Sequence, residues 1–471
     1  MSEANVVHRT RSETHVLTSS TTPLLLETLI NPLILDNTVP YLPVSSLLNL
    51  ALASKAFRCL LYQTPRVFRH LDLTRVKTAR FDVGKSDQGQ TWHNVELDDY
   101  LTEDDFYSGP LRGVFSTLKR RDLLRDVQTL VLDGLSVTAE LCNDIINDPT
   151  YSVRILSIRD VKNLNHGKLR GALQYACRGS RPEGAPRLKG LYVFGAKDSL
   201  PDPTSANSSS ISAEWNQKSQ QALTTSLQHE GDAWWSKRGR MISRPIPEDW
   251  ANCLLACEGI IAFDAVLCQG PRHRSSPVFG TTPLRAMCGP AVATYAVPPC
   301  AGCGKCPEGP TVPGLDFSSQ AVPLLAPPPL MSSSLRAATT PRGPATAFVP
   351  RCIDCLRERY CLSCNKWWCE ACYTVPGHNR PGAADSVVIL DEDGSVASFE
   401  IEPEFLNAKA KARVSRSCWE CGMNCDSCIS KTQKSCRKCC SGYCLVHNEG
   451  SCTKFVSRPR CVSRGRGLKR R

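Results

Sequence analysis

The segment NPLILDNTVPYLPVSSLLNLALASKAFRCLLYQTPRVFRHLDLTRV, residues 31–76, combines short apolar runs with four prolines. A turn at residues 41–43 precedes a longer helical run, which the Ser45-Ser46 pair is placed to cap. Apolar residues recur in this run with a helical period that breaks near Ser54. Pro65 ends the run, because the residue before a proline is pushed out of the helical region. The pattern predicts a unit of three short helices.

This predicted unit is small for its leucine content. Three short helices cannot bury all of these side chains, so several should stay exposed, and an exposed apolar patch usually marks a partner site. An alternative remains open at this point, in which the three helices pack into the rest of the chain as an ordinary subdomain.

The same segment resembles an F-box. The resemblance runs through Pro32, Leu42-Pro43, Leu47-Leu48, Ala53-Ser54-Lys55, Phe57, Leu60-Leu61 and the closing stretch 68–73. At its opening the family's usual Leu-Pro is replaced by Asn31-Pro32. The resemblance implies docking onto the adaptor subunit of an SCF-type (cullin-RING) ubiquitin ligase. The residues expected to contact the adaptor are Pro32, Leu33, Leu42, Pro43, Leu47, Leu48, Leu52, Phe57 and Leu60.

A second pattern follows the helices. The spacing Phe68-x-x-Leu71-x-Leu73-x-x-Val76 recurs from Val127 and from Val153, and in part from Leu188. This is the strand signature of a leucine-rich repeat, and the segment 138–147 is the expected return helix. The intervals are uneven, which predicts a short irregular solenoid. Strands of an ordinary α/β sheet are the alternative, because each repeat alone is only a short apolar pattern.

Cysteine usage points to metal. The chain has 471 residues, a net charge of +12 and 26 cysteines, many of them in Cys-x-x-Cys pairs. It shows no secretion signal and no apolar run of eighteen residues, which predicts a protein that is neither exported nor membrane-spanning, in the nucleus, the cytoplasm or both. In that setting such pairs favour zinc over disulfides.

Three cysteine groups carry this prediction. The group Cys300-x2-Cys303-x2-Cys306 is weak by itself, with Cys288 or Cys268 as a fourth ligand and His273 as a poor one. In the second group the simplest assignment places Cys352/Cys355 with Cys369/Cys372 on one zinc, and Cys361/Cys364 with His378 or with later cysteines on another. Trp367-Trp368 should supply apolar cover. Cys253 and Cys257, one helical turn apart among apolar residues, are expected to be buried core thiols.

The third group lies near the C-terminus. Its segment from Cys436 through Cys444-x2-His447 to Cys452 resembles the second half of an AN1-type zinc finger, without that pattern's second histidine. Two or more structural zinc ions are therefore expected, with no assignment of which cysteines share an ion. The predicted ligands are Cys352, Cys355, Cys361, Cys364, Cys369, Cys372, Cys418, Cys421, Cys425, Cys428, Cys436, Cys439, Cys444, His447 and Cys452.

Together these features predict an α+β multidomain chain with F-box helices, a short leucine-rich-repeat-like region and small zinc-stabilised modules joined by disordered linkers. Residues 85–107 should be an acidic surface loop, and residues 247–268 look helical. The predicted division is a disordered leader (1–22), the F-box (23–76), the repeat-like region (77–200), a linker (201–245), a helical segment with a cysteine cluster (246–306), a Pro/Ser-rich linker (307–350), a zinc module (351–380), a linker (381–416), a Cys/His zinc module (417–452) and a basic tail (453–471).

The expected function is a non-catalytic substrate receptor. The sequence has no HExxH, GxSxG, Walker or dinucleotide-binding motif, and cysteine-rich closed sites serve folding rather than catalysis. The receptor would hold an unknown protein target near the ligase. Two alternatives stay open: a zinc protein whose basic tail binds nucleic acid or acts as an import signal, and a self-sufficient RING-like ligase built on the 352–378 cluster.

Overall fold

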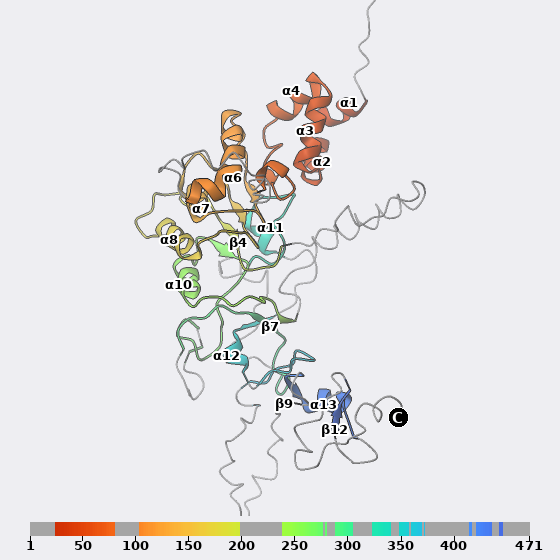
Figure 1. The fold of residues 1–471 in the computed structure, drawn as a ribbon, viewed down its shortest axis with the longest axis vertical. Coiled ribbons are helices and arrows are strands. Elements are labelled where there is room, and N and C mark those ends of the chain that lie inside the picture. The colour runs from red at the N-terminus through yellow and green to blue at the C-terminus, as the bar shows by residue number, and fades with distance from the viewer. Residues whose placement is uncertain are drawn as a thin grey trace, which may run out of the picture. The chain divides into compact units, whose positions relative to one another are not determined.

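The computed structural model describes residues 24–80, 103–197, 238–276, 278–279, 288–304, 323–340, 348–357, 359–369, 372, 414–416, 421–435 and 442–445. The chain divides into two compact units, residues 1–68 and residues 69–471. Figure 1 shows the helices and strands of the two units.

The N-terminal helical unit contains α1 (Leu24–Ile30), α2 (Pro32–Thr38), the 3-10 turn η1 (Val39–Tyr41), α3 (Val44–Ala53) and α4 (Lys55–Gln63). Asn31 caps α2 by accepting the Leu33 N–H, and Pro32 occupies the first helical position, where its missing N–H costs nothing. The predicted break at Ser54 divides the long run into two helices, because the Ser54 hydroxyl accepts the Phe57 N–H and starts α4. Pro43, not Ser45 or Ser46, is the residue before α3.

A parallel sheet opens the second unit. Its strands are β1 (His70–Asp72), β2 (Thr129–Val131), β3 (Ile155–Ser157), β4 (Gly190–Tyr192) and β6 (Ala262–Phe263), in that order across the sheet. The strands pair in register, so one row of residues crosses all five: Leu71, Leu130, Leu156, Leu191 and Phe263. Four of these strands lie in the predicted stretches. The fifth lies in a segment that was expected to be helical.

Helices connect the strands. They are η2 (Lys77–Ala79), α6 (Glu103–Arg120), α7 (Ala139–Asn147), α8 (His166–Ala176) and α10 (Asp249–Ala256). The predicted return helix corresponds to α7, and Thr138 caps it by accepting the Leu141 N–H. The start of α6 corrects the expectation of a loop up to residue 107. Trp250 of α10 lies edge-on to Phe263, with ring centroids 6.5 Å apart, so this helix covers the leucine side of β6.

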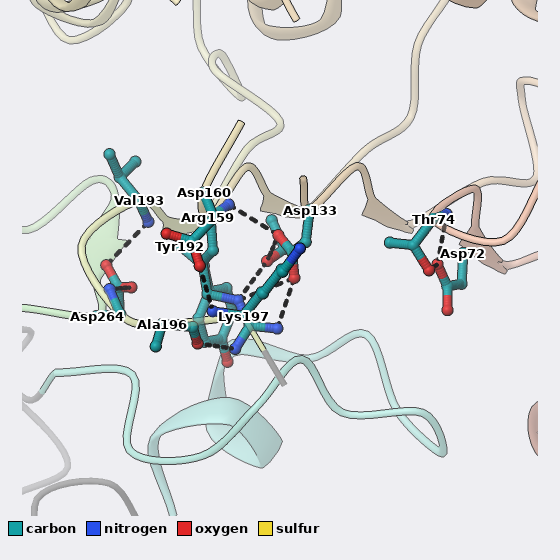
Figure 2. A network of polar contacts seen from close by, with 12 residues as sticks. Asp72, Thr74, Asp133, Arg159, Asp160, Tyr192, Val193, Ala196, Lys197 and Asp264 are labelled. Carbon is teal, nitrogen blue, oxygen red and sulfur yellow. Dashed lines mark hydrogen bonds and ion pairs between the residues drawn. The ribbon is translucent and has the colours of Figure 1, made fainter. Parts of the chain in front are cut away.

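Polar side chains order the loops that follow the strands (Figure 2). The buried Asp133 carboxylate pairs with the Arg159 guanidinium at 2.6 Å and also accepts the Ser157 hydroxyl. Asp264 accepts the backbone N–H groups of Val193, Phe194 and Gly195, at 2.7 to 3.1 Å. Burial raises the pKa of Asp264, although these three N–H donors favour its charged form. Each carboxylate thereby fixes the turn after a neighbouring strand.

The opposite side of the sheet is covered by residues 323–340, which include α11 (Leu335–Thr339). Leu324 and Ala338 are fully buried with Ile155 and Tyr192. The Leu324 N–H donates to the Phe263 carbonyl at the β6 edge, and the Arg69 guanidinium donates to the Met331 carbonyl near β1. The covering segment therefore crosses the sheet, and the prediction of a linker over 307–350 is wrong for this part.

The remaining described elements surround the cysteines. A three-stranded sheet has the order β5 (Gly239–Arg240), β7 (Tyr295–Val297) and β8 (Val349–Arg351), and α12 (Ile353–Leu356) follows β8. Further along are the pair β9 (Val414–Arg416) and β10 (Met423–Cys425), the helix α13 (Asp426–Thr432), and the hairpin β11 (Gln433–Ser435) and β12 (Gly442–Cys444). Residues 239–240, 349–350 and 414–416 thus belong to sheets, although all three were expected to lie in linkers.

The predicted bounds of the F-box and of the terminal segments compare with the structure as follows. The closing stretch of the predicted F-box, residues 69–73, belongs to the second unit, where β1 starts the parallel sheet. The leader 1–22 and the tail 453–471 lie outside the described residues. Within the described part of the chain, no helix is long and apolar enough to cross a membrane.

Candidate metal centres and docking face

Three groups of four Cys or His side chains each bring their ligand atoms within 4.8 Å of one another among the described residues. The first metal centre is Cys268, His273, Cys352 and Cys355. The second is Cys300, Cys303, Cys369 and Cys372, and the third is Cys361, Cys364, Cys425 and Cys428. One set of three cysteines with a histidine and two sets of four cysteines are typical of structural zinc, and four protein ligands complete a tetrahedral site.

The first centre is entirely buried. The His273 Nε2 atom lies 3.2 Å from the Cys352 Sγ atom and 3.3 Å from the Cys355 Sγ atom. Its Nδ1 atom lies 2.7 Å from the Gly289 carbonyl oxygen. Because a carbonyl can only accept, Nδ1–H donates this hydrogen bond, which orients the ring with Nε2 toward the sulfurs. Burial lowers the pKa of His273, but hydrogen bonds with Cys268 and Cys352 outweigh it and raise this pKa to about 11. The imidazole is thus held against the sulfurs, in the position of a fourth ligand beside three thiols.

The second centre holds thiols at metal-ligand spacing. The Cys303 and Cys369 Sγ atoms lie 3.8 Å apart, which is the separation of about 3.8 Å that two sulfurs have on a tetrahedral zinc with bonds of about 2.3 Å. The backbone N–H of Cys369 donates to the Cys300 Sγ atom at 3.1 Å. Burial raises the pKa of Cys300, but backbone N–H groups outweigh it and lower this pKa to about 7. The fold thus stabilises a thiolate before any metal arrives.

In the third centre, too, backbone N–H donors lower the pKa of a cysteine. The Cys364 and Cys425 Sγ atoms lie 3.9 Å apart. Asn424, which is 1% exposed, accepts the Ser363 N–H and hydroxyl and so joins the two halves of the site. Burial raises the pKa of Cys361, but backbone N–H donors including that of Cys425 outweigh it and lower this pKa to about 7.

The ligand pairs of the three centres alternate along the chain. In sequence order, the pairs belong to the first, second, first, third, second and third centre. The first and second centres therefore cross, and so do the second and third. Trp367 and Trp368 belong to a buried apolar cluster that also contains cysteines of the second and third centres. The tryptophan pair therefore covers these two centres, as the sequence predicted.

The structure corrects the predicted pairing of cysteines. Cys352/Cys355 do not share a site with Cys369/Cys372, because β7 and β8 pair antiparallel and bring earlier parts of the chain beside both knuckles. Cys361/Cys364 do meet later cysteines, as one of the predicted options has it. Cys268, His273, Cys300 and Cys303 are ligands of the first and second centres, although the sequence offered them only as a weak separate group and they are absent from the predicted ligand set. The structure divides that group, with Cys268 and His273 in the first centre and Cys300 and Cys303 in the second.

The remaining predicted ligands lie either outside the described residues or outside the three metal centres. Cys418, Cys436, Cys439, His447 and Cys452 lie outside the described residues, as does His378. Cys421 and Cys444 are described and belong to none of the three centres. Cys253 and Cys257 are fully buried in α10 and at its end, which confirms the expectation of core thiols.

The predicted adaptor contacts divide into two classes. Leu47 and Phe57 are 3% and 6% exposed, so they form the core of the N-terminal helical unit and cannot contact a partner directly. Leu42 and Leu60 are partly buried, and Leu60 borders a shallow apolar groove with Leu26 and Ile30. The predicted residues that remain exposed are Pro32, Leu33, Pro43, Leu48 and Leu52.

Other large aliphatic side chains of this unit are exposed as well, and they were not predicted: Leu24, Leu25, Ile30 and Ile34. Leu33 is 74% exposed and Leu52 is 71% exposed. We call the set of exposed large aliphatic residues of this unit the docking face. Its members are Leu24, Leu25, Ile30, Leu33, Ile34, Leu48 and Leu52.

No family model, curated protein or solved structure matches this chain.

Gly270 provides a test of the first metal centre. A Cβ atom at this position would lie 2.4 Å from the Cys355 Sγ atom and 3.4 Å from the Cys268 Sγ atom. Gly270→Ala is therefore expected to displace the ligands and to lower bound zinc by about one ion per chain, measured by elemental analysis. Gly289→Ala is the matched control, because a Cβ atom there meets nothing within 4 Å. Equal zinc contents in the two variants would contradict the assignment of this centre.

Proposed function

We propose that this protein is a non-catalytic substrate receptor that docks through its N-terminal helical unit onto the adaptor of an SCF-type ubiquitin ligase. The observation that carries the proposal is the docking face, in which seven large aliphatic side chains of one small unit are exposed. A contiguous exposed apolar patch usually marks a protein interface, and the proposal assigns these side chains to one.

The construction of the helical unit supports a docking role. Leu47, Ala51, Phe57 and Leu61 fill its core, so the unit does not need Leu33, Leu48 or Leu52 for its own packing. Leu48 and Leu52 are four residues apart in α3 and thus lie on the same side of that helix. The F-box resemblance covers the same residues and gives the partner its identity in this proposal.

The second unit would hold the target. We interpret its parallel sheet as a short leucine-rich-repeat region and the three metal centres as structural zinc. The covering segment already occupies one side of the sheet, since Leu324 and Ala338 are fully buried there. Target contacts are therefore assigned to the loops and the cysteine-rich part rather than to the sheet face. In this role the protein would contribute proximity, not chemistry, to ubiquitin transfer.

The test is co-purification of the full chain with the SCF adaptor and cullin. The double variant Leu33→Asp/Leu52→Asp is expected to lower adaptor affinity at least tenfold (about 1.4 kcal/mol or more), because it places two charges in an apolar interface without disturbing the core. Its circular dichroism should match the wild type. Leu47→Asp is not a suitable test, since it would unfold the unit.

Tyr175→Asp is the matched control for this experiment. Tyr175 lies in α8 of the second unit and is 57% exposed, so the change places one negative charge at an exposed aromatic residue outside the docking face. Binding by the control and loss in the double variant would support the proposal. A well-folded wild-type chain that recovers no adaptor, or a double variant that binds normally, would refute it.

A further inference from the structure

We propose that Cys421 and Cys444 supply two of the ligands of a fourth metal ion of the zinc class, at a site separate from the three metal centres and independent of the docking proposal. Their Sγ atoms lie 3.2 Å apart, and neither residue belongs to the three centres. This separation is well beyond a disulfide bond of about 2.05 Å. It is closer to the 3.8 and 3.9 Å between sulfurs in the second and third centres.

The local backbone at Cys421 supports this assignment. In the second and third centres the N-terminal Cys-x2-Cys pair is followed by a residue with positive φ, Gly304 at 68° and Asn365 at 57°. Cys421 also ends a Cys-x2-Cys pair, and the next residue, Gly422, has a φ of 66°. The turn after Cys421 thus has the conformation that the same chain uses at two sets of metal ligands.

Hydrogen bonds connect Cys421 to the third centre. The Asn424 side chain donates to the Cys421 carbonyl at 3.3 Å, while its oxygen accepts from Ser363. The same short stretch therefore presents Cys421 to one site and Cys425 to another. Adjacent sites that share one rigid loop are a compact way to stabilise a module with little apolar core.

Cys444 is held just as firmly. It is fully buried at the end of β12, where it pairs with Gln433 of β11. The next residue, Leu445, donates its N–H to the Thr432 carbonyl at the end of α13. Because α13 carries Cys428 of the third centre, the hairpin is anchored against an existing metal site. The two thiols approach each other from elements that are both fixed.

Native mass spectrometry of the full chain tests the proposal by counting zinc ions. The wild type is expected to hold four ions, and Cys421→Ser/Cys444→Ser is expected to hold three. Cys59→Ser is the matched control and should keep four, because this cysteine is exposed in the helical unit, outside the metal centres. Three ions in the wild type, or four in the double variant, would overturn the proposal.

Alkylation of the wild type provides a second measurement that does not depend on a variant folding. Cys421 and Cys444 are expected to resist iodoacetamide in the zinc-loaded protein and to react fully after chelation. Thiols that react before chelation would show that no metal protects them. Resistance both before and after chelation, lifted only by a reductant, would identify a disulfide. Either result overturns the fourth site.

Discussion

Zinc chelation is expected to unfold the cysteine-rich part of the second unit and to leave helices α1–α4 folded. Metal-binding energy in closed sites is folding energy, of the order of 10 kcal/mol or more for each structural zinc. The N-terminal helical unit has a single cysteine, Cys59, and no metal centre among its described residues. Its core of Leu47, Phe57 and Leu61 should therefore survive metal removal.

The alternation of ligand pairs makes this unfolding cooperative. Both pairs of the second centre lie within or beside the loops that the other two centres close. Loss of one ion thus releases chain segments that hold the next site together. The covering segment lies between Cys303 and Cys352, so the chain at both of its ends leads to a metal ligand. We expect its contacts with the sheet to weaken as well.

Hydrogen exchange followed by mass spectrometry checks this result. Chelation should remove protection from β8 and α12, residues 349–356, and reduce it in residues 323–340. Peptides from α3 and α4 serve as the internal control and should keep their exchange rates. Added zinc should restore protection. Persistent protection at 349–356 without metal would contradict a folding role for the centres, and equal loss in α3 and α4 would contradict an independent helical unit.

The sheet was largely predictable because its strands repeat one pattern. Leu71, Leu130 and Leu156 stand at equivalent positions, and the structure pairs them directly. The fifth position was missed, because Phe263 follows a helix closely and its strand is only two residues long. No periodicity can appear in so short a run, and its partner strand supplies the hydrogen bonds that define it.

For residues 323–340 the composition gave a wrong prediction, because a few buried side chains determine the structure there. Residues 323–340 are rich in proline and serine, which is typical of a linker. Yet Leu324, Leu325 and Ala338 are buried, and the backbone hydrogen bond from Leu324 to Phe263 joins the segment to the sheet. The spacing of these three buried side chains follows neither a helical nor a strand period. Their burial depends on the surface of the sheet against which they pack, and the local sequence carries no information about that surface.

The pairing of the metal ligands likewise depends on contacts between distant parts of the chain. Each Cys-x-x-Cys knuckle is a local feature, so its spacing predicted a ligand pair correctly. The choice of partner pair is set by strand pairing between segments about fifty residues apart, such as Tyr295 with Arg351. Spacing alone therefore predicted a partner within the same cysteine group, Cys369/Cys372, for Cys352/Cys355. His273 was undervalued because its role depends on burial beside Cys352 and on the Gly289 carbonyl.

Replacing Arg159 with Met is expected to destabilise the second unit by about 3–5 kcal/mol, because it leaves the Asp133 carboxylate buried without its countercharge. Arg159 is 1% exposed, and two of its nitrogens donate to the same Asp133 oxygen at 2.6 and 2.9 Å. A third nitrogen donates to the Ala196 carbonyl at 3.1 Å. The guanidinium thus joins the loops after three strands, and urea unfolding measures what this connection contributes.

The matched control is Lys168→Met, which removes an ion pair with Glu140 at the surface. Its side chains are 65% and 41% exposed, so water screens the pair and the expected cost is below about 1 kcal/mol. The double variant Asp133→Asn/Arg159→Met should recover part of the loss, since it no longer buries an unpaired charge. Equal costs for Arg159→Met and Lys168→Met would show that the loops are fixed by their backbone alone. A double variant that is less stable than Arg159→Met would instead assign the main role to the hydrogen bonds that Asp133 accepts from Ser157 and from the Arg159 backbone.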